Sequence, residues 1–331
     1  MKRTKHPWSN SIISIGLLLM LTSSCIKENV IEPTPKIKAP EIFSISSNAV
    51  TISSEIISEG NEDITNRGIC WNTQPFPTID NNKKDGDVKD NTIFCRTSEL
   101  KPNTKYYART FATNRIGIFY GDEIIFTTNN TVTDQDGNIY NTVTIGTQVW
   151  MVENLKTTTY NDGLEIPFIS KNSAWLNLKS AVYCWYDNSQ KNKDSYGALY
   201  NWGAVNSGKL CPSGWHVPTD AEWTILTDNL GGKSIAAGLL KEAETPVTFA
   251  DKIATNYSGF SALPSGSAGV GTPTFLGIGN RGIWWTSTID TNEYNIYWSM
   301  YFDGSTIIDR NGFLSRTNLL NGLSVRCIKD K

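Results

Sequence analysis

The stretch LCPSGWHVPTDAEWTIL, residues 210–226, decides the fold of the second half of this chain. Thr219 and Glu222 have the spacing of a capping box, in which each side chain accepts a hydrogen bond from the other residue's backbone amide. Pro218 ends the extended segment before them, because proline fixes φ and lacks an N–H. The sequence therefore predicts a helix that begins directly after Thr219.

The helix that follows is amphipathic. Trp223, Leu226 and Leu230 recur at helical spacing, so they form one apolar face that needs a sheet to cover. Gly231 and Gly232 then end the helix. We expect a short, well-capped helix packed on a β-sheet.

The same stretch also contains the residues of a candidate active site, His216 and Cys211. A general base or a metal ligand is one interpretation of this histidine. However, no nucleophile motif lies nearby, and one histidine without assembled partners builds neither a triad nor a metal site. We therefore interpret His216 as a structural imidazole, and predict no catalytic residue, no metal site and no cofactor.

The first 24 residues have the pattern of a signal peptide. Three basic residues precede the apolar run of residues 11–21, which is too short to span a bilayer. The stretch TSSC then ends in Cys25, in the manner of a bacterial lipobox of the Bacteroidetes type. We predict a lipid anchor at Cys25 and an outer-membrane lipoprotein that faces either the periplasm or the cell surface, of which we favour the surface. An ordinary secretory signal with a chance cysteine is the alternative.

Charge and cysteine content exclude some functions. Removing residues 1–24 takes away three basic residues and no acidic one, so the formal net charge falls from −2 to −5. A mildly acidic chain without a basic block is not expected to bind nucleic acid. No cysteine pair has C-x-x-C spacing, which argues against zinc. Cys184 is expected to be a buried thiol.

Residues 25–39 are polar and contain prolines, as an extended tether does, and residues 40–128 have an all-β pattern. Leu100, Pro102, Thr104 and Tyr106 form an L-x-P-x-T-x-Y motif within residues 100–128, which resembles the second half of a fibronectin type III domain. The motif predicts an immunoglobulin-like sandwich with a tyrosine corner at Tyr106. Whether Cys70 and Cys95 pair stays open, because geometry decides it.

Residues 129–331 carry a second set of motifs. They begin with a hairpin turn at Asp136 and Gly137, which we prefer to a calcium loop because the later ligands are missing. The segments DQDGNIYNTVTIGTQVWMVENLK, CWYDN, YGALYNWGAV, LCPSGWHVPTDAEWTIL, GFSALPSG, GIWWTST and GLSVRCIKD follow in order. This series resembles the Fibrobacter succinogenes major paralogous domain, whose fold is similar to the C-type lectin-like fold of the formylglycine-generating, sulfatase-modifying family.

The resemblance implies a multidomain chain, in which an all-β immunoglobulin/fibronectin III-like sandwich is followed by an α+β C-type lectin-like domain. In such folds the helix region meets the final strand, so a disulfide between Cys211 and Cys327 is expected. The formylglycine-generating relatives use a late pair of cysteines, whereas residues 282–304 contain none. That oxidation chemistry is therefore not expected here.

The predicted function is binding. Residues 264–288 form a Gly/Ser/Thr-rich run before an aromatic strand, and lectin-like domains place their ligand contacts on such loops. Asn280, Arg281, Trp284 and Tyr294 are the candidate contacts, with one of Trp284 and Trp285 in the core and the other partly exposed. We expect a non-enzymatic binding or adhesion lipoprotein whose partner is a glycan or a surface protein. A degenerate enzyme that uses His216, or a purely structural component of a surface assembly, is the alternative.

Overall fold

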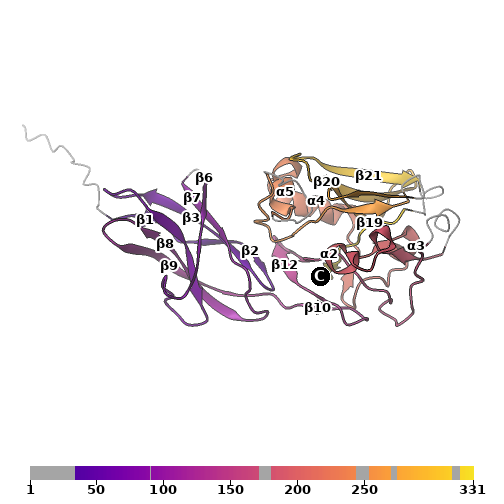
Figure 1. The fold of residues 1–331 in the computed structure, drawn as a ribbon, viewed down its shortest axis with the longest axis horizontal. Helices are drawn as coiled ribbons and strands as arrows, with labels where there is room; N and C mark the ends of the chain where they lie inside the picture. Colours follow the sequence, from indigo (N-terminus) through magenta and orange to yellow (C-terminus); the bar gives the residue numbers. More distant parts are fainter. Residues whose placement is uncertain (1–33, 90, 171–179, 244–252, 270–273, 315–320) are drawn as a thin grey trace, which may run out of the picture.

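The computed structural model describes residues 34–89, 91–170, 180–243, 253–269, 274–314 and 321–331. They form two parts that lie end to end along the long axis of the molecule (Figure 1). The first part is built from strands, and the second combines short helices with several small sheets. The predicted order, an all-β part before a part with mixed helices and strands, is present. The signal peptide, Cys25 and most of the tether lie outside the described residues.

The first part is a sandwich of two antiparallel sheets. In one sheet, β3 (Val50–Ser58) pairs with its neighbours β1 (Lys36–Ile37), β2 (Glu41–Ser46) and β7 (Thr92–Arg96), and β7 pairs with β6 (Asp87–Lys89). The other sheet has the order β5 (Asn82–Asp85), β4 (Asn66–Asn72), β8 (Lys105–Thr113) and β9 (Ile118–Thr127). Burial alternates along β7, as the period of two predicts for a strand with one buried face.

The predicted tyrosine corner is confirmed. Tyr106 is buried against Phe126 in the sandwich core, and its hydroxyl accepts a hydrogen bond from the backbone N–H of Lys101 at 3.1 Å. The ring therefore packs while the hydroxyl holds the preceding loop, which is the role this residue has in fibronectin type III-like sandwiches.

One sheet continues from the sandwich into the second part. Strand β2 pairs antiparallel with β12 (Thr142–Ile145), and the ladder runs on through β13 (Gln148–Met151), β22 (Ile328–Lys329) and β16 (Trp215–His216). With the sandwich strands this makes a nine-stranded sheet. Backbone hydrogen bonds thus hold the two parts in one orientation, a feature that the sequence patterns did not predict.

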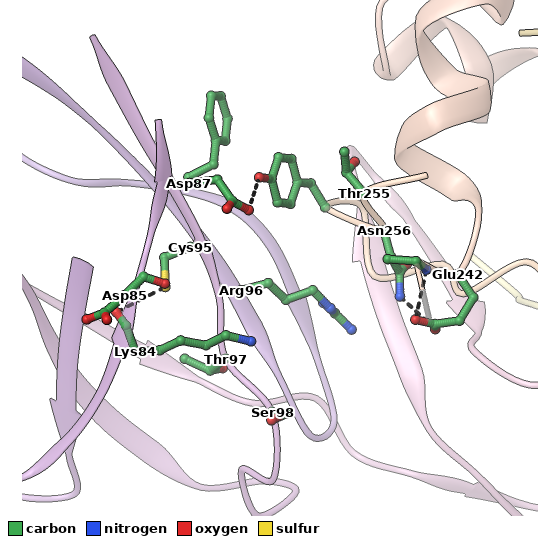
Figure 2. A pocket seen from close by; sticks show the side chains of 13 residues that line it. Lys84, Asp85, Asp87, Cys95, Arg96, Thr97, Ser98, Glu242, Thr255 and Asn256 are labelled. Atoms are coloured by element: carbon green, nitrogen blue, oxygen red, sulfur yellow. Dashed lines mark hydrogen bonds between the residues drawn. The ribbon is translucent and has the colours of Figure 1, made fainter. Parts of the chain in front are cut away.

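Side chains support this junction at two places. Ser47 Oγ donates to the carbonyl of Asn130 at 2.7 Å, and it accepts from the N–H of Thr142 at 2.8 Å. At the second place, the ring of Tyr257 stacks on Phe94 with 5.2 Å between centroids. The Tyr257 hydroxyl donates to Asp87 Oδ2 at 2.8 Å (Figure 2).

The second part is built around β19 (Arg281–Ile289), β20 (Tyr294–Tyr301) and β21 (Ile308–Leu314), with helices α4 (Asp220–Asn229) and α5 (Lys233–Leu240) lying beside this sheet (Figure 1). The smaller elements are β10 (Val132–Thr133), β11 (Ile139–Tyr140), β14 (Tyr183–Cys184), η1 (Tyr186–Asn188), α2 (Asn192–Tyr196), β15 (Leu199–Tyr200), α3 (Trp202–Val205), β17 (Ser265–Ala268) and β18 (Phe275–Ile278). The pairing of β10 with β11 confirms the hairpin expected around Asp136.

Two hydrophobic clusters cover the two faces of β19. Trp284 lies in one of them, where Trp223 of α4 stacks on Trp298 with 5.8 Å between ring centroids. Trp285 lies in the other, against Trp202. The two neighbouring tryptophans do face opposite ways, as predicted. Both are fully buried, however, because both faces of the strand are covered, so the expectation of one partly exposed ring was wrong.

The Gly/Ser/Thr-rich run also differs from the expected long loop. Within residues 264–288, β17 and β18 pair as an antiparallel hairpin that leads directly into β19. Glycines allow this compact path. Gly266 has φ +66°, and a Cβ there would lie 2.6 Å from the carbonyl oxygen of Leu276.

The Cys211–Cys327 disulfide is present, with the two Cα atoms 6.0 Å apart. It closes a loop across a sequence separation of 116 residues and lies within the cluster that contains Trp285. Cys70, Cys95 and Cys184 are free and buried, so the first two do not pair across the sandwich. Burial raises the pKa of Cys70 to about 11 and that of Cys95 to about 12, and it also raises the pKa of Cys184.

Arg326, one residue before this disulfide, is fully buried. Its Nη2 donates to Asn154 Oδ1 at 2.9 Å, and Nη1 donates to the carbonyl of Phe260. The guanidinium also lies 4.3 Å from the centroid of the Phe260 ring. This arginine is therefore a structural cation whose N–H groups are supplied with acceptors.

Candidate functional site

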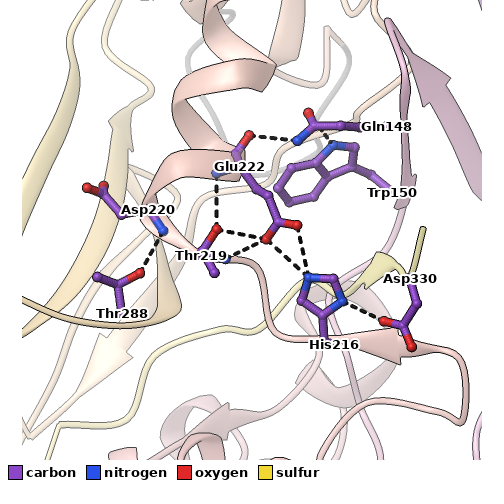
Figure 3. Close-up of polar contacts among 8 residues, drawn as sticks. All are labelled: Gln148, Trp150, His216, Thr219, Asp220, Glu222, Thr288 and Asp330. Carbon is purple, nitrogen blue, oxygen red and sulfur yellow. Dashed lines mark hydrogen bonds and ion pairs between the residues drawn. The ribbon is translucent and has the colours of Figure 1, made fainter.

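His216 lies between two carboxylates (Figure 3). Its Nδ1 is 2.6 Å from Asp330 Oδ1, and its Nε2 is 3.0 Å from Glu222 Oε1. The expectation that this histidine has no side-chain partners was wrong, because Asp330 follows it by 114 residues and reaches it only through the pairing of β16 with β22. Carboxylates only accept hydrogen bonds, so an imidazole protonated at both nitrogens donates to both.

The capping box is present as predicted. The amide of Glu222 donates to Thr219 Oγ1 at 3.2 Å, and the amide of Thr219 donates to Glu222 Oε2 at 2.8 Å. The Glu222 carboxylate therefore holds both the start of α4 and the His216 ring (Figure 3). Cys211 is committed to its disulfide and offers no thiol. The cluster consequently joins β16, α4 and the chain end, and its geometry is that of a brace.

The four predicted ligand contacts do not form one site. Trp284 is fully buried, and its Nε1 donates to Asn154 Oδ1 at 2.8 Å, so it is a core residue and the prediction that it contacts ligand was wrong. Asn280 is exposed at the turn before β19. Arg281 pairs in register with Tyr301, whereas Tyr294 is at the opposite end of β20. Alternation along β20 also places Tyr294 and Tyr301 on opposite faces.

Arg281 nevertheless has a defined place. Its guanidinium lies 4.8 Å from the centroid of the Tyr301 ring, and its Nη2 donates to Ser299 Oγ at 2.9 Å. Among the described residues Nε of Arg281 is buried without an acceptor. Arg281 and Tyr301 thus form a local pair at one end of the sheet, separate from Tyr294.

A hollow of about 310 Å³ opens beside Trp215. Its lining comes from the end of the sandwich, from the connection to β10 and from the sheet itself: Thr128, Asn129, Asn130, Thr131, Val132, Thr142, Val149, Trp215 and Lys329. Trp215 is partly exposed, and Asn130, Thr131 and Lys329 are exposed. A partly exposed aromatic ring among mainly polar side chains suits a ligand that presents both apolar and hydrogen-bonding groups.

Trp215 is held firmly in place. It lies opposite Lys329 in the β16–β22 pair, and its N–H donates to the carbonyl of Pro212 at 3.0 Å. The disulfide at Cys211 fixes the same segment from the other side. The position of this ring is therefore set before any ligand arrives, which lowers the entropic cost of binding.

Neither a metal-binding cluster nor a membrane-spanning helix is found in the described part of the chain. No group of three or more His, Cys, Asp or Glu side chains there is placed to hold a metal ion. No helix within the same residues has the length and apolar character needed to cross a bilayer.

The family model of the Fibrobacter succinogenes major domain matches residues 143–329, more than half of the chain. The chain belongs to this family. The matched residues of the Fibrobacter succinogenes major domain run from β12 to β22, so they include α4, the disulfide, His216 and Glu222, and they end one residue before Asp330. The sandwich, the connection after it, β10 and β11 precede the matched residues.

Comparison with curated proteins found no match. Solved structures that match include domains of titin, at 17% identity, a TM-score of 0.23, and coverage of 30% of this chain and 33% of that one. A human fibronectin type III domain gives 16% identity, a TM-score of 0.24, and coverage of 30% and 92%. The twitchin kinase region of C. elegans gives 11% identity, a TM-score of 0.23, and coverage of 66% of this chain and 37% of that one. The chain spans about a third of the titin structure.

The assignment of the sandwich in front of the Fibrobacter succinogenes major domain depends on the observed strand pairing alone, and not on these TM-scores. A fibronectin type III-like module followed by this domain is an arrangement consistent with a surface or binding protein. The lectin-like kinship of the second part stays a prediction.

No sequence pattern predicts the contacts between the two parts. Trp215 stood in the opening motif, but its neighbours Asn129 and Asn130 belong to the connection between the domains, more than 80 residues earlier. Arg96, whose guanidinium reaches the second part, follows an ordinary strand pattern. Only knowledge of the β2–β12 pairing brings these residues together.

Proposed function

We propose that the protein is a non-enzymatic binding or adhesion lipoprotein of the cell surface, anchored in the outer membrane through Cys25. The sandwich serves as the stem, and the Fibrobacter succinogenes major domain serves as the recognition head. The pairing of β2 with β12 supports these two roles. A stem that shares a sheet with its recognition domain holds that domain at a fixed angle.

The ligand class that fits best is a glycan, bound in the hollow beside Trp215. The observation that carries this proposal is a partly exposed tryptophan, held in place by strand pairing and a disulfide, at the edge of an open hollow. The C–H groups of a sugar ring pack well on an aromatic face. Exposed Asn130, Thr131 and Lys329 offer hydrogen-bond partners for its hydroxyl groups.

The test is a glycan array probed with the mature protein and with Trp215→Ala. We expect binding to one set of glycans, and loss of that binding in the variant. Tyr294→Ala is the matched control, since Tyr294 is another partly exposed aromatic residue of the same domain and does not line the hollow. Equal glycan binding by the wild-type protein and Trp215→Ala would show that the hollow is not the binding site. Absence of binding to any glycan would favour a structural role for the protein.

The His216 cluster is the observation that favours an enzyme instead, because a histidine between two carboxylates is a common arrangement for proton transfer. His216→Ala separates the two functions. A lower melting temperature with glycan binding retained identifies a brace. Loss of an activity at unchanged melting temperature would identify a catalytic group.

A further inference from the structure

A second hollow lies at the junction, and it shares no lining residue with the hollow beside Trp215. It has a volume of about 350 Å³. Strands β5, β6 and β7 and the residues just after β7 line one side, and Glu242, Ala243 and Thr255–Tyr257 of the second part line the other (Figure 2). A ligand in this cavity would contact both parts of the molecule.

Arg96 is the central side chain of this cavity. It is the last residue of β7, and it extends across the cavity towards the second part (Figure 2). A Cβ on Gly259 would lie only 2.8 Å from its Nη1, so the guanidinium packs against the backbone of that turn. Burial lowers the pKa of Arg96, and the negative charge of Glu242 acts in the opposite direction.

Nη1 of Arg96 is buried and has no hydrogen-bond partner among the described residues. Leaving a charged donor buried and unpaired costs free energy. In the fully buried Arg326, by contrast, both terminal nitrogens have acceptors. The unmatched donor of Arg96 therefore points to an acceptor that a ligand supplies.

The acidic residues around the cavity are already engaged by neutral donors. Asp87 accepts from the Tyr257 hydroxyl, and Glu242 accepts from Asn256 Nδ2 at 2.8 Å. Asp85 accepts from Asn66 Nδ2 at 3.0 Å. Within the described part of the chain, neither Arg96 nor the exposed cavity residue Lys84 has a carboxylate within 4.0 Å. Neutral donors leave these three carboxylates charged but occupy their oxygens, so Arg96 and Lys84 are the groups that can pair with a ligand carboxylate.

We propose that this cavity binds the carboxylate of an acidic sugar residue, with Arg96 and Lys84 as its partners. A guanidinium matches a carboxylate in shape and hydrogen-bond geometry. Three carboxylates stand near these two cations, so a ligand with a single negative charge fits better than a dianionic phosphate. The lining is more polar than apolar, and its apolar side chains are Phe94, Cys95, Ala243 and Tyr257, which suits a hydroxyl-rich ligand better than a hydrocarbon.

Calorimetric titration of the full mature protein tests the ligand class. Glucuronate is expected to bind, whereas glucose, which lacks the carboxylate, and inorganic phosphate are expected not to bind. N-acetylglutamate serves as the peptide-like carboxylate and is expected to bind more weakly than glucuronate. Equal affinity for glucose and glucuronate, binding of N-acetylglutamate in preference to glucuronate, or no binding of glucuronate would overturn the proposal.

Arg96→Gln tests the residue. Glucuronate affinity is expected to fall by about tenfold or more, which is the scale for losing a charge-assisted contact. Arg115→Gln is the control, because it removes the same charge from the exposed Arg115–Glu62 pair elsewhere on the sandwich and should leave affinity unchanged. The melting temperature of Arg96→Gln without ligand should not fall, since the native guanidinium is incompletely paired. A lower melting temperature with unchanged affinity would identify Arg96 as structural and overturn the proposal.

Glu242→Gln gives an independent check on the same cavity. It keeps an acceptor for Asn256 but removes a negative charge near the guanidinium, so glucuronate should bind more tightly. Failure of the glycan array would leave this titration interpretable on its own.

Discussion

Ile45 of the sandwich lies directly opposite Thr144 of the Fibrobacter succinogenes major domain in one antiparallel ladder. Asn129, at the start of the connection between them, donates from Nδ2 to the carbonyl of Ile45 at 3.2 Å and to Thr144 Oγ1 at 3.0 Å. An edge strand of each part is thereby covered by the other, which also protects both edges from pairing with other chains. The molecule should therefore behave as one mechanical unit.

The junction should couple the unfolding of both parts. Tyr257→Ala removes the ring stacked on Phe94 and the hydrogen bond to Asp87, and it should lower the free energy of unfolding by about 1–2 kcal/mol. Differential scanning calorimetry should show one transition for the wild-type protein, with a lower midpoint in the variant. Tyr107→Ala, on the other sheet of the sandwich, is the comparison for loss of a half-buried ring. Two separate wild-type transitions would contradict the coupling.

The disulfide should contribute strongly to stability. It constrains the unfolded chain over a sequence separation of 116 residues, and the chain-entropy model assigns about 4–5 kcal/mol to a loop of this length. Urea denaturation of the Cys211→Ser, Cys327→Ser double variant should reveal a loss of this order. Peptide mapping without reduction should recover one cross-linked peptide, and free thiols at both positions would refute the pairing.

The capping box should be measurable in isolation. Thr219→Ala leaves the amide of Glu222 without its acceptor, so it should cost about 1 kcal/mol of stability, while Thr219→Ser keeps a hydroxyl in place and should cost much less. Chemical denaturation of both variants gives the comparison. Equal losses in the two variants would mean that the methyl group of Thr219, and not its hydroxyl, supports the helix.

Alkaline pH should destabilise the sandwich through its buried thiols. The pKa of Cys70 rises from 9.0 to about 11 on folding, because burial disfavours the thiolate. The unfolded chain therefore loses this proton first, so the stability that this thiol provides is complete below pH 9 and is lost as pH rises from 9 to 11. Melting curves of wild type and Cys70→Ala should diverge over that range, with the steeper decline in the wild type. Parallel curves would show that the thiol does not contribute.

Features formed by residues close together in the sequence could be predicted, whereas the pairing of strands far apart in the sequence could not. The capping box of Thr219 and Glu222 and the corner at Tyr106 depend on residues within a few positions of each other, so their spacing identifies them. The disulfide followed from a family resemblance whose motifs fix where the helix and the last strand lie.

The missed features all depend on strand edges that meet across long separations. Asp330 reaches His216 because β22 pairs with β16, and Arg96 reaches Gly259 because β2 pairs with β12. Alternating hydrophobicity identifies a strand and its buried face but not its neighbour. For the same reason, the sequence could not show that both faces of β19 are covered and that Trp284 is therefore core.

The central claim is that a glycan occupies the hollow beside Trp215. The most direct measurement follows the indole N–H signal of Trp215 in a ¹⁵N correlation spectrum, assigned with Trp215→Phe, while a glycan selected on the array is added. The account predicts a progressive shift of that signal that saturates with the binding curve, while the signals of the fully buried Trp223 and Trp284 stay in place. A saturated complex in which the Trp215 signal has not moved would contradict it.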